Sequence, residues 1–520
     1  MKKKNFNFIF SIVLLFIVTT YSCTSDNWDA HYSPASGEKS NLNLYDYIKT
    51  QDSLSIFTQM LKITGYDSIL SKPQTYTVWA PVNTALQNID LNDTNKVTEI
   101  VENHIARFSY PTSGISSKTI FMLSKKLIIF AGNGTNFTFG GNKLIKSDIG
   151  TSNGILHYID NYVPYLPNIW EFIGKTEGLD SLKNYLYSNS KLEFDLTASG
   201  NDIGTDANGQ LIYDSVFTFT NKILNRIGKF DTEDSIYTAI LPTNAAWTEA
   251  YNRIKPYFKT LPADGGDGLQ RLQTQWAIIK DIVFRKRISN PASHDSLVST
   301  IGNVFHQPDY LFAGATKHEV SNGLVYVNDL LKYKAVDSWQ KEIRVEAEYA
   351  SFTQTGSKSN CDIFQRTSTG SNLDISNNKY IYIKNLATSN FSPVFVKFDI
   401  PYTLSAKYNI YCVFVPTFIT DTTDVRPSKV NFFLTYIDAS GKEQADKAIT
   451  VTDNITNPRL TTKMFVTQFE FPYCNLPTSD NISTYVASVK LKVQNAVKTN
   501  ETVSYNRDMR IDCIILEPVQ

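Results

Sequence analysis

The sequence has no excess of charge of either sign. Its 520 residues include 50 Lys or Arg and 50 Asp or Glu, so the formal net charge is zero. A chain without a net field has no general attraction for nucleic acid or for an anionic membrane surface. We therefore expect no nucleic-acid partner.

Cysteine is scarce and unevenly placed. The five cysteines are Cys23, Cys361, Cys412, Cys474 and Cys513. The last four could form two disulfides, in three connectivities. Cys412 and Cys513, however, lie in apolar strand-like runs, where a small buried hydrophobic side chain is the simpler interpretation. The sequence leaves both possibilities open.

Signatures of catalysis are also missing. The chain has no nucleophile elbow, no phosphate-binding glycine loop, no zincin helix and no ordered set of Ser, His and Asp. A carboxylate pair for glycoside hydrolysis stays open, because 50 acidic residues always allow some pair. We expect no enzyme, with turnover of a polysaccharide as the competing possibility.

What the sequence does have is an internal repeat. Residues 76–85, YTVWAPVNTA, return as residues 237–246, YTAILPTNAA. Each copy later carries a second phrase, SNGIL at 152–156 and SNGLV at 321–325. An ordered pair of dissimilar motifs that recurs as a pair indicates duplication of one folded unit.

A third repeated motif lies at the start of each copy, so a set of three motifs recurs in the same order. Residues 44–48, LYDYI, precede DSL in the first copy, and residues 169–173, IWEFI, precede DSL in the second. The set resembles the fasciclin domain, whose pattern also has a histidine phrase midway and a last phrase of Asn-Gly-x-Ile-His type. In copy one these are 103–105 (NHI) and 153–160 (NGILHYID). The resemblance implies an α+β fold for each copy.

Both repeated phrases have a structural explanation. Pro81 cannot donate to a sheet ladder, so the strand through Val78 is predicted to end there. Asn83 and its counterpart Asn244 then stand where a helix could begin and are predicted N-caps. The Asn-Gly pair at Gly154 predicts a turn that tolerates positive φ, followed by a strand that re-enters the core.

His104 and His157 are the first copy's candidates for a metal or catalytic pair. We favour buried, hydrogen-bonded histidines, because no Cys or carboxylate cluster stands at ligand spacing beside them. Copy two holds Lys280-Asp281-Ile282 at the middle position, and Tyr326 replaces the last histidine.

The N-terminus is typical of an exported lipoprotein. Three lysines at positions 2–4 precede an apolar stretch, which together predict a signal peptide at 1–22. The alternative of an uncleaved anchor is weaker, because a membrane span needs about 20 apolar residues. Cys23 is the predicted lipid attachment site, and residues 23–40 are a predicted flexible tether.

The residues after Cys23 give a prediction of where in the cell the protein is located. The segment 24–29, TSDNWD, resembles the acidic export signal of some Gram-negative surface lipoproteins. Asp26 and Asp29 could equally be ordinary solvated linker charges. The prediction is a lipid-anchored protein of the outer membrane that faces the cell exterior.

The length of the chain and the change in residue pattern after Trp339 predict three domains. A typical domain has about 150 residues, which gives the same number. We predict fasciclin-like domains at 41–166 and 167–339, the second with an insertion near 186–225, and an all-β sandwich at 340–520. In the insertion, Asp206 and Asn208 resemble part of a calcium loop, but a polar hairpin turn at Asn208-Gly209 is the favoured interpretation.

The C-terminal third consists of short strand-like runs with polar turns. These runs are 380–383, 394–400, 408–415, 431–437, 486–493 and 511–516. Its first phrase, RVEAE at 344–348, and its last, RIDCIIL at 510–516, resemble the end strands of jelly-roll modules such as family-6 carbohydrate-binding modules. That resemblance implies a structural calcium, with Glu348 and Asp512 as the positions that carry over. Solvated strand-end carboxylates are the alternative.

Sugar binding needs flat apolar rings together with planar hydrogen-bonding groups. All six tryptophans precede the predicted sandwich. Tyrosines could serve instead, and we consider Tyr380, Tyr382, Tyr402 and Tyr505 without assigning a subsite.

These features together predict a non-catalytic cell-surface lipoprotein that binds glycan or protein. Its expected role is that of an accessory component in an outer-membrane polysaccharide-uptake system, with a transporter and other lipoproteins as partners. The alternative is cell adhesion or matrix binding through the fasciclin-like domains. The sequence identifies neither the ligand nor the oligomeric state.

Overall fold

The computed structural model describes residues 38–200, 202–205, 209–213, 215–349, 355–356, 360–368, 373–386, 393–419, 421–477 and 487–519. These residues form two compact units, which are described separately. Unit 1 contains the described residues up to Glu171 together with Asp231–Ser235 and Glu319–Asn322, and unit 2 contains the others. None of the helices in these ranges is long and apolar enough to cross a membrane.

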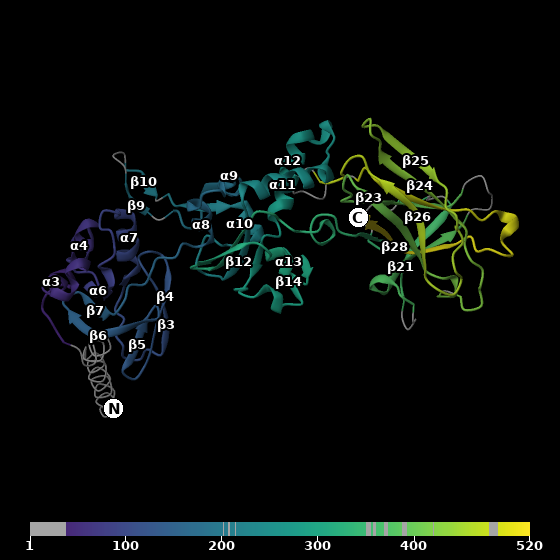
Figure 1. Cartoon of the computed structure of the whole chain (residues 1–520). Helices are drawn as coiled ribbons and strands as arrows, with labels where there is room; N and C mark the ends of the chain where they lie inside the picture. Colours follow the sequence, from purple (N-terminus) through teal and green to yellow (C-terminus); the bar gives the residue numbers. More distant parts are fainter. Residues whose placement is uncertain are drawn as a thin grey trace, which may run out of the picture. The chain divides into compact units, whose positions relative to one another are not determined.

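The first repeat combines a helical layer with one mixed sheet (Figure 1). Its helices are α3 (Leu44–Lys49), η1 (Asp52–Leu54), α4 (Ser55–Ile63), α5 (Tyr66–Leu70), α6 (Asn83–Leu86) and α7 (Thr94–Asn103). Its strands are β1 (Tyr76–Pro81), β2 (Ile105–Arg107), β3 (Ser117–Phe121), β4 (Leu127–Asn133), β5 (Asn136–Phe139), β6 (Asn142–Thr151) and β7 (Gly154–Ile159). The sheet order is β2-β1-β7-β6-β5-β4-β3, and only the β1–β7 pair is parallel.

The central strand β1 separates two apolar cores. All six of its residues are buried. Val78 packs with the helices in one core, and Trp79 packs with strands β3 to β6 in the other. The Trp79 ring stacks on Phe139 with centroids 4.3 Å apart. The strand ends at Pro81, as predicted.

The second repeat reproduces this plan in α8 to α13 and β8 to β17. Its helices are α8 (Ile169–Lys175), α9 (Asp180–Ser188), α10 (Lys222–Ile227), α11 (Asn244–Ile254), η2 (Lys255–Phe258), η3 (Pro262–Asp264), α12 (Gly266–Ile279), η4 (Pro291–Ser293), α13 (Asp309–Phe312) and η5 (Ala335–Asp337). Its sheet strands are β12 (Tyr237–Pro242), β13 (Val283–Arg285), β16 (Thr316–Val320) and β17 (Gly323–Asn328), and β14 (Ser296–Val298) pairs with β15 (Val304–His306). Tyr237 lies opposite Gly323 in a parallel pair, as Tyr76 lies opposite Gly154.

The repeated glycine is required by close packing against the preceding strand. A Cβ on Gly154 would lie 2.0 Å from the carbonyl oxygen of Tyr76, and one on Gly323 would lie 1.7 Å from that of Tyr237. The predicted reason, a turn with positive φ, holds for Gly323 (φ 147°) but is wrong for Gly154, whose φ is not positive. The shared requirement is therefore the absence of a side chain.

The repeated asparagine of the first phrase caps a neighbouring helix. The prediction that Asn83 and Asn244 are N-caps of their own helices is wrong, because Val82 and Thr243 hold those positions. Asn83 Oδ1 instead accepts the N–H of Ile56 at 3.0 Å, in the first turn of α4. Asn244 accepts the N–H of Ser181 in α9 at 2.8 Å. Each side chain thus satisfies a free donor of another helix.

The second asparagine also holds the start of its repeat. Asn153 accepts the N–H of Leu44 at 2.7 Å and donates to two backbone carbonyls, those of Leu70 and Lys72. Asn322 accepts the N–H of Ile169 at 3.0 Å in the same way. The three repeated motifs of the sequence therefore meet at one place in each copy.

Unit 1 also contains a buried ion network around Lys126, which is only 4% exposed. Its Nζ lies 2.6 Å from Glu171 Oε2 and 2.8 Å from Glu233 Oε1. Tyr165 donates to Glu171 at 2.9 Å, and Ser321 donates to Glu233 at 2.9 Å. The network joins the turn before β4 to segments that follow the first repeat in the chain.

The insertion of the second repeat forms two antiparallel ladders. Strand β8 (Ser190–Phe194) pairs with β11 (Phe217–Asn221), and β9 (Asp202–Thr205) pairs with β10 (Leu211–Tyr213). The predicted hairpin is confirmed by the β9–β10 pair, and Gly209 has a positive φ of 80°. Asp206 and Asn208 lie outside the described residues.

The C-terminal part is a sandwich of two antiparallel sheets (Figure 1). One has the order β20-β21-β28-β23-β26 with β18 also on β28, and the other has the order β19-β22-β27-β24-β25. The strands are β18 (Ile343–Glu346), β19 (Thr355–Gly356), β20 (Cys361–Thr367), β21 (Lys379–Asn385), β22 (Phe395–Asp399), β23 (Lys407–Phe414), β24 (Val430–Ile437), β25 (Glu443–Ile449), β26 (Thr462–Glu470), β27 (Lys490–Asn495) and β28 (Met509–Pro518). Short 3₁₀ turns connect them: η6 (Ser376–Asn378), η7 (Thr417–Ile419) and η9 (Thr499–Glu501). Phe414 of β23 and Phe432 of β24 meet between the sheets, with ring centroids 6.3 Å apart.

The predicted fold class is confirmed: α+β fasciclin-like repeats are followed by an all-β sandwich. Among the described residues, the four cysteines of the sandwich form no disulfide. Cys412 and Cys513 are fully buried in β23 and β28, as small hydrophobic side chains would be.

Candidate functional site

His104 and His157 do not form a metal site. Both are fully buried. Within the described ranges, the one cluster of potential metal ligands lies elsewhere and contains neither histidine. Each ring nitrogen has a backbone partner: His104 bonds to the carbonyl of Ile100 at 2.7 Å and accepts the N–H of Val163 at 2.9 Å. The favoured prediction, a buried hydrogen-bonded histidine, is confirmed.

His157 makes the equivalent kind of link, and the second repeat shows that a histidine is not needed for it. Its Nε2 lies 3.0 Å from the carbonyl oxygen of Tyr110, while Nδ1 accepts the N–H of Asp148. In the second repeat Tyr326 occupies the matching register position and donates to the carbonyl of Ile288 at 2.8 Å. Burial lowers the pKa of His104 and of His157 to about 4, so both stay neutral at physiological pH.

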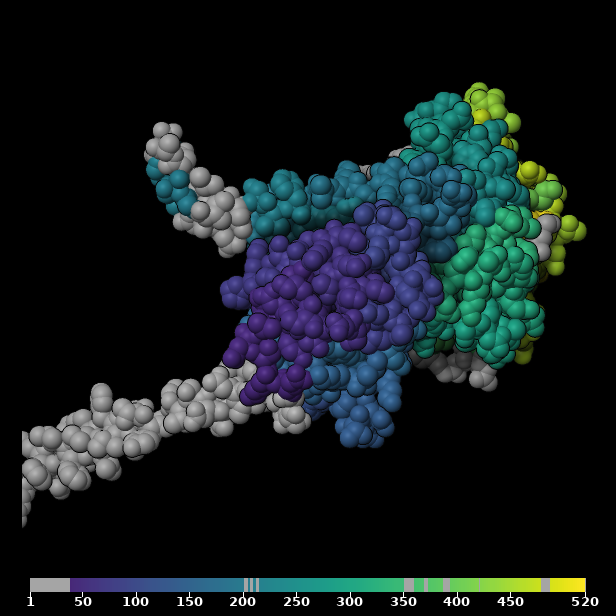
Figure 2. Space-filling model, turned by 60° about the vertical axis from the view of Figure 1, so that its left-hand side comes forward, coloured from purple at the N-terminus to yellow at the C-terminus, as the bar shows by residue number. Residues whose placement is uncertain are grey.

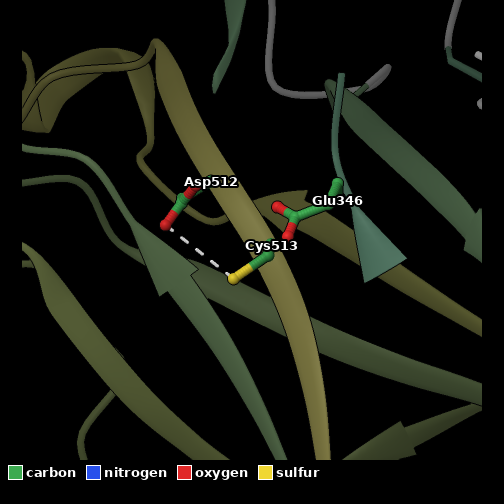
Figure 3. Close-up of side chains that lie close together, drawn as sticks. All are labelled: Glu346, Asp512 and Cys513. Atoms are coloured by element: carbon green, nitrogen blue, oxygen red, sulfur yellow. Dashed lines mark hydrogen bonds between the residues drawn. The ribbon is translucent and has the colours of Figure 1, made fainter. Parts of the chain in front are cut away.

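A cluster of acidic side chains lies where the first and last strands of the sandwich meet. Glu346 ends β18 and lies opposite Cys513 of β28, beside Asp512 (Figure 3). One ligand atom from each of these three side chains lies within 4.8 Å of the others. Ser376 donates its N–H to Asp512 at 3.2 Å and its hydroxyl to Glu346 at 2.6 Å. The sequence resemblance named Glu348 and Asp512 but missed Glu346.

This cluster holds more negative charge than its hydrogen bonds satisfy. Both carboxylate oxygens of Glu348 and Oε2 of Glu346 are buried without a hydrogen-bond partner among the described residues. Burial, together with the charges of Glu346 and Glu348, raises the pKa of Asp512 to about 7. Burial also raises the pKa of Glu348. Buried carboxylates with free oxygens are costly unless a cation compensates them.

The donor set fits a hard divalent cation such as calcium. Glu346 and Asp512 supply carboxylate oxygens, which calcium prefers, whereas Glu348, which the sequence resemblance named, is not part of this cluster. Cys513 is not a suitable ligand, because burial and the neighbouring Asp512 raise the pKa of its thiol and keep it protonated. Calcium bound by Glu346 and Asp512 would compensate their charge and fix β18 to β28.

We therefore expect calcium to stabilise the sandwich against thermal unfolding. At a calcium concentration a hundred times the dissociation constant, the gain is about 2.7 kcal/mol. Asp512→Asn should remove most of this response, whereas Glu470→Gln on the exposed side of β26 should keep it. Differential scanning calorimetry with calcium or EDTA measures both, and an unchanged wild-type transition would contradict the calcium assignment.

Without calcium, the stability of the sandwich should also depend on pH. Folding raises the pKa of Asp512 from its ordinary value of 3.8 to about 7, so the folded protein holds this proton more tightly than the unfolded chain does. Without calcium, the contribution of Asp512 to stability is therefore fully present below about pH 4 and is lost as the pH rises towards 7. Saturating calcium should flatten this trend.

A cleft in the sandwich lies beside β20, β21 and β28. Its volume is about 760 Å³, and the loops 419–426 and 502–508 form its other walls. Three tyrosines, four arginines, three aspartates and two asparagines contribute to its lining: Tyr380, Tyr382, Tyr505, Arg366, Arg426, Arg507, Arg510, Asp421, Asp424, Asp508, Asn385 and Asn506. Of the four tyrosines considered from the sequence, three meet here. Tyr402 is not among the lining residues.

Hydrogen bonds fix the polar side chains of the cleft in place. Asp508 accepts from the hydroxyl of Tyr382 at 2.6 Å and from the N–H of Asn385 at 2.8 Å. The guanidinium of Arg426 forms a fork on Asp424, with bonds of 2.9 and 2.8 Å. The contacts of Asp508 join residues more than 120 positions apart in the chain, whereas the Arg426–Asp424 pair is local.

The electrostatics of the cleft follow from these pairs. Hydrogen bonds from Arg426 lower the pKa of Asp424 to about 2, so this carboxylate stays ionised. Burial and the bond to Asp508 raise the pKa of Tyr382 to about 12, so its phenol stays neutral. Arg510 lies over the Tyr382 ring, 4.8 Å from its centroid. The cleft therefore combines tyrosine side chains with charged, planar hydrogen-bonding groups.

Sequence reasoning could not have assembled this cleft. Its walls come from four separate segments of the chain, and no single segment has an unusual composition. The alternation of Tyr380 and Tyr382 on one strand face was the one signal available. Cys23, the predicted lipid attachment site, lies outside the described residues.

Comparison with known protein families gives one match. Residues 52–164 match the family model of the fasciclin domain. A sequence comparison with curated proteins gives no match.

Solved structures provide further similarities. A FAS1 domain pair from the insect cell adhesion molecule fasciclin I shares 13% identity, covering 55% of this chain and 98% of that one, with a TM-score of 0.21. A xylan-binding domain of family 22 shares 12% identity over 35% of this chain and 94% of that one, with a TM-score of 0.21. A family 35 carbohydrate-binding module from Clostridium thermocellum shares 8% identity over 34% of this chain and 99% of that one, with a TM-score of 0.19. Because these values are low, we argue the function from the residues of this chain.

Proposed function

We propose that this protein is a non-catalytic binding protein whose sandwich holds a glycan in the cleft beside Tyr382. The observation that carries the proposal is the combination of ring surface and fixed planar groups in one cleft of about 760 Å³. A pyranose has C–H groups on its faces and hydroxyls around its edge, so it needs both kinds of contact at once. The forked Arg426–Asp424 pair provides a fixed, charged, planar group in the lining of the cleft.

A glycan array probed with the purified protein tests this proposal. For any glycan that binds, we expect Tyr505→Ala to weaken binding about tenfold, which corresponds to the loss of one ring contact. Phe465→Ala removes an exposed aromatic side chain of β26 that is not part of this cleft, and it should leave the affinity unchanged. Isothermal titration calorimetry measures the affinity. Binding to no glycan, or equal losses in the two variants, would contradict the assignment of the cleft.

The cellular role that we propose is capture of polysaccharide at the cell surface. The signal peptide at 1–22 and Cys23 support export and lipid attachment, and the acidic segment after Cys23 supports display on the outer membrane. A tethered binding module fits an accessory component of a polysaccharide-uptake system. Co-purification of the lipidated protein with a membrane transporter would support this role.

Adhesion is the second candidate function. It is favoured by the fasciclin match at residues 52–164. In this case the partner would be a matrix or cell-surface protein, and it would be recovered in place of a transporter. Pull-down with and without residues 41–338 distinguishes the two, because deletion of the repeats should abolish adhesion but not glycan binding.

A further inference from the structure

The insertion of the second repeat exposes an unusual amount of apolar side chain. In the β8–β11 ladder, Phe194 lies opposite Phe217 and Leu192 lies opposite Phe219, so all four occupy one face. Their exposed fractions are 71% for Leu192, 51% for Phe194, 58% for Phe217 and 43% for Phe219. Figure 2 shows the end of the insertion, around β9 and β10, projecting from the surface.

This face points to a protein partner. A two-stranded ladder is marginally stable in water unless further strands or another surface cover its apolar face. Among the described residues, β8 pairs with β11 alone, so its other edge has no strand beside it. Exposed apolar side chains next to a free strand edge are typical of a site that pairs with another chain.

The charges of β8 identify the partner. Lys191 and Glu193 lie on the opposite face from Leu192, and neither forms an ion pair within the described chain. If two copies of β8 pair in antiparallel fashion about Leu192, Lys191 of each copy lies opposite Glu193 of the other. Side chains directly opposite in an antiparallel pair are close enough for ion pairing. The strand is therefore complementary to itself.

We propose that two copies of this chain associate through β8 in a symmetric dimer. The two ladders then form one four-stranded sheet in the order β11-β8-β8-β11. Leu192 of each copy packs against Leu192 of the other, and two reciprocal Lys191–Glu193 pairs form on the opposite face. This surface is separate from the glycan cleft, and the proposal does not depend on it.

Charge exchange tests the proposal. Sedimentation velocity of the full chain should show a monomer–dimer equilibrium. Lys191→Glu and Glu193→Lys should each raise the dissociation constant at least about tenfold, because both pairs become repulsive. The double exchange should restore the wild-type value. Lys96→Glu, on the exposed face of α7, is the control for net charge and should change nothing. A monomer at every concentration, or a double exchange that restores nothing, would overturn the proposal.

A crosslink gives an independent measurement. Opposite residues of an antiparallel pair have Cα atoms about 4.5–5.5 Å apart, within the range of a disulfide. Leu192→Cys should therefore form an intermolecular disulfide under mild oxidation, while Thr218→Cys on β11 should not. Equal crosslinking of the two variants would refute pairing through β8.

Discussion

Replacing Gly154 or Gly323 by alanine is expected to destabilise its repeat by about 4 kcal/mol, at the upper end for a single substitution. The added Cβ would lie 2.0 Å or 1.7 Å from a carbonyl oxygen of the neighbouring parallel strand. Because that oxygen belongs to the backbone of the central strand, it cannot move aside as a flexible side chain could. The strand pair must separate, and this disrupts the cores on both sides of β1 or β12.

Gly268 provides the matched control. It lies in α12, has no positive φ, and a Cβ there would meet nothing within 4 Å. Gly268→Ala should therefore stabilise the helix by up to about 1 kcal/mol. Calorimetry separates the transitions of the domains, since a chain of several domains does not unfold in one step. A change below about 0.5 kcal/mol for Gly154→Ala would contradict the close contact between β1 and β7.

Much of the architecture could be predicted because it is encoded locally. The phrase that contains Pro81 ends a strand wherever it occurs, and β-branched and aromatic runs became β21 to β24 and β28 within one or two residues. The fold of the second repeat could be predicted from the motifs that it shares with the first, because duplicated units have the same fold. Strands with polar or mixed composition, such as β25 and β26, gave no comparable signal and were missed.

The roles of individual residues were harder to predict because they depend on contacts distant in sequence. Asn83 stands at the start of α6, yet it caps α4, 27 positions earlier in the chain. Glu346 stands two positions before Glu348, but only the pairing of β18 with β28 brings it beside Asp512. Such contacts arise from tertiary structure, which local propensity does not specify.

The comparison of the two repeats separates structure from function. His157 bonds to the carbonyl of Tyr110 in the first copy, and Tyr326 bonds to that of Ile288 in the second. The strand register aligns Ile282 with His104, so the predicted alignment of Lys280-Asp281-Ile282 with residues 103–105 is wrong by one position. Side chains that can be exchanged in this way support the fold and do not carry a shared chemistry. The features that occur once, namely the cleft of the sandwich and the β8–β11 ladder, are therefore where we place binding.

The buried ion network of unit 1 gives the second large effect. Burial by itself would raise the pKa of Glu171, but hydrogen bonds from Lys126 and from the backbone of Asn168 outweigh it and lower the pKa. Lys126→Met keeps the length of the side chain and removes its charge, which leaves two carboxylates without their cation. Breaking a buried pair in this way typically costs about 3–5 kcal/mol.

We therefore expect Lys126→Met to lower the unfolding midpoint of unit 1 strongly, while Lys125→Met, at the exposed neighbouring position, changes it little. Neutralising Glu171 and Glu233 as well, with glutamine at both positions, should recover most of the loss, because the cost lies in unpaired charge and not in lost packing. Acid should have a similar effect on the single variant, since protonation removes the same charges. Urea unfolding of the four proteins at neutral and acidic pH measures these differences. If the triple variant is as unstable as Lys126→Met, the network contributes through geometry and not through charge.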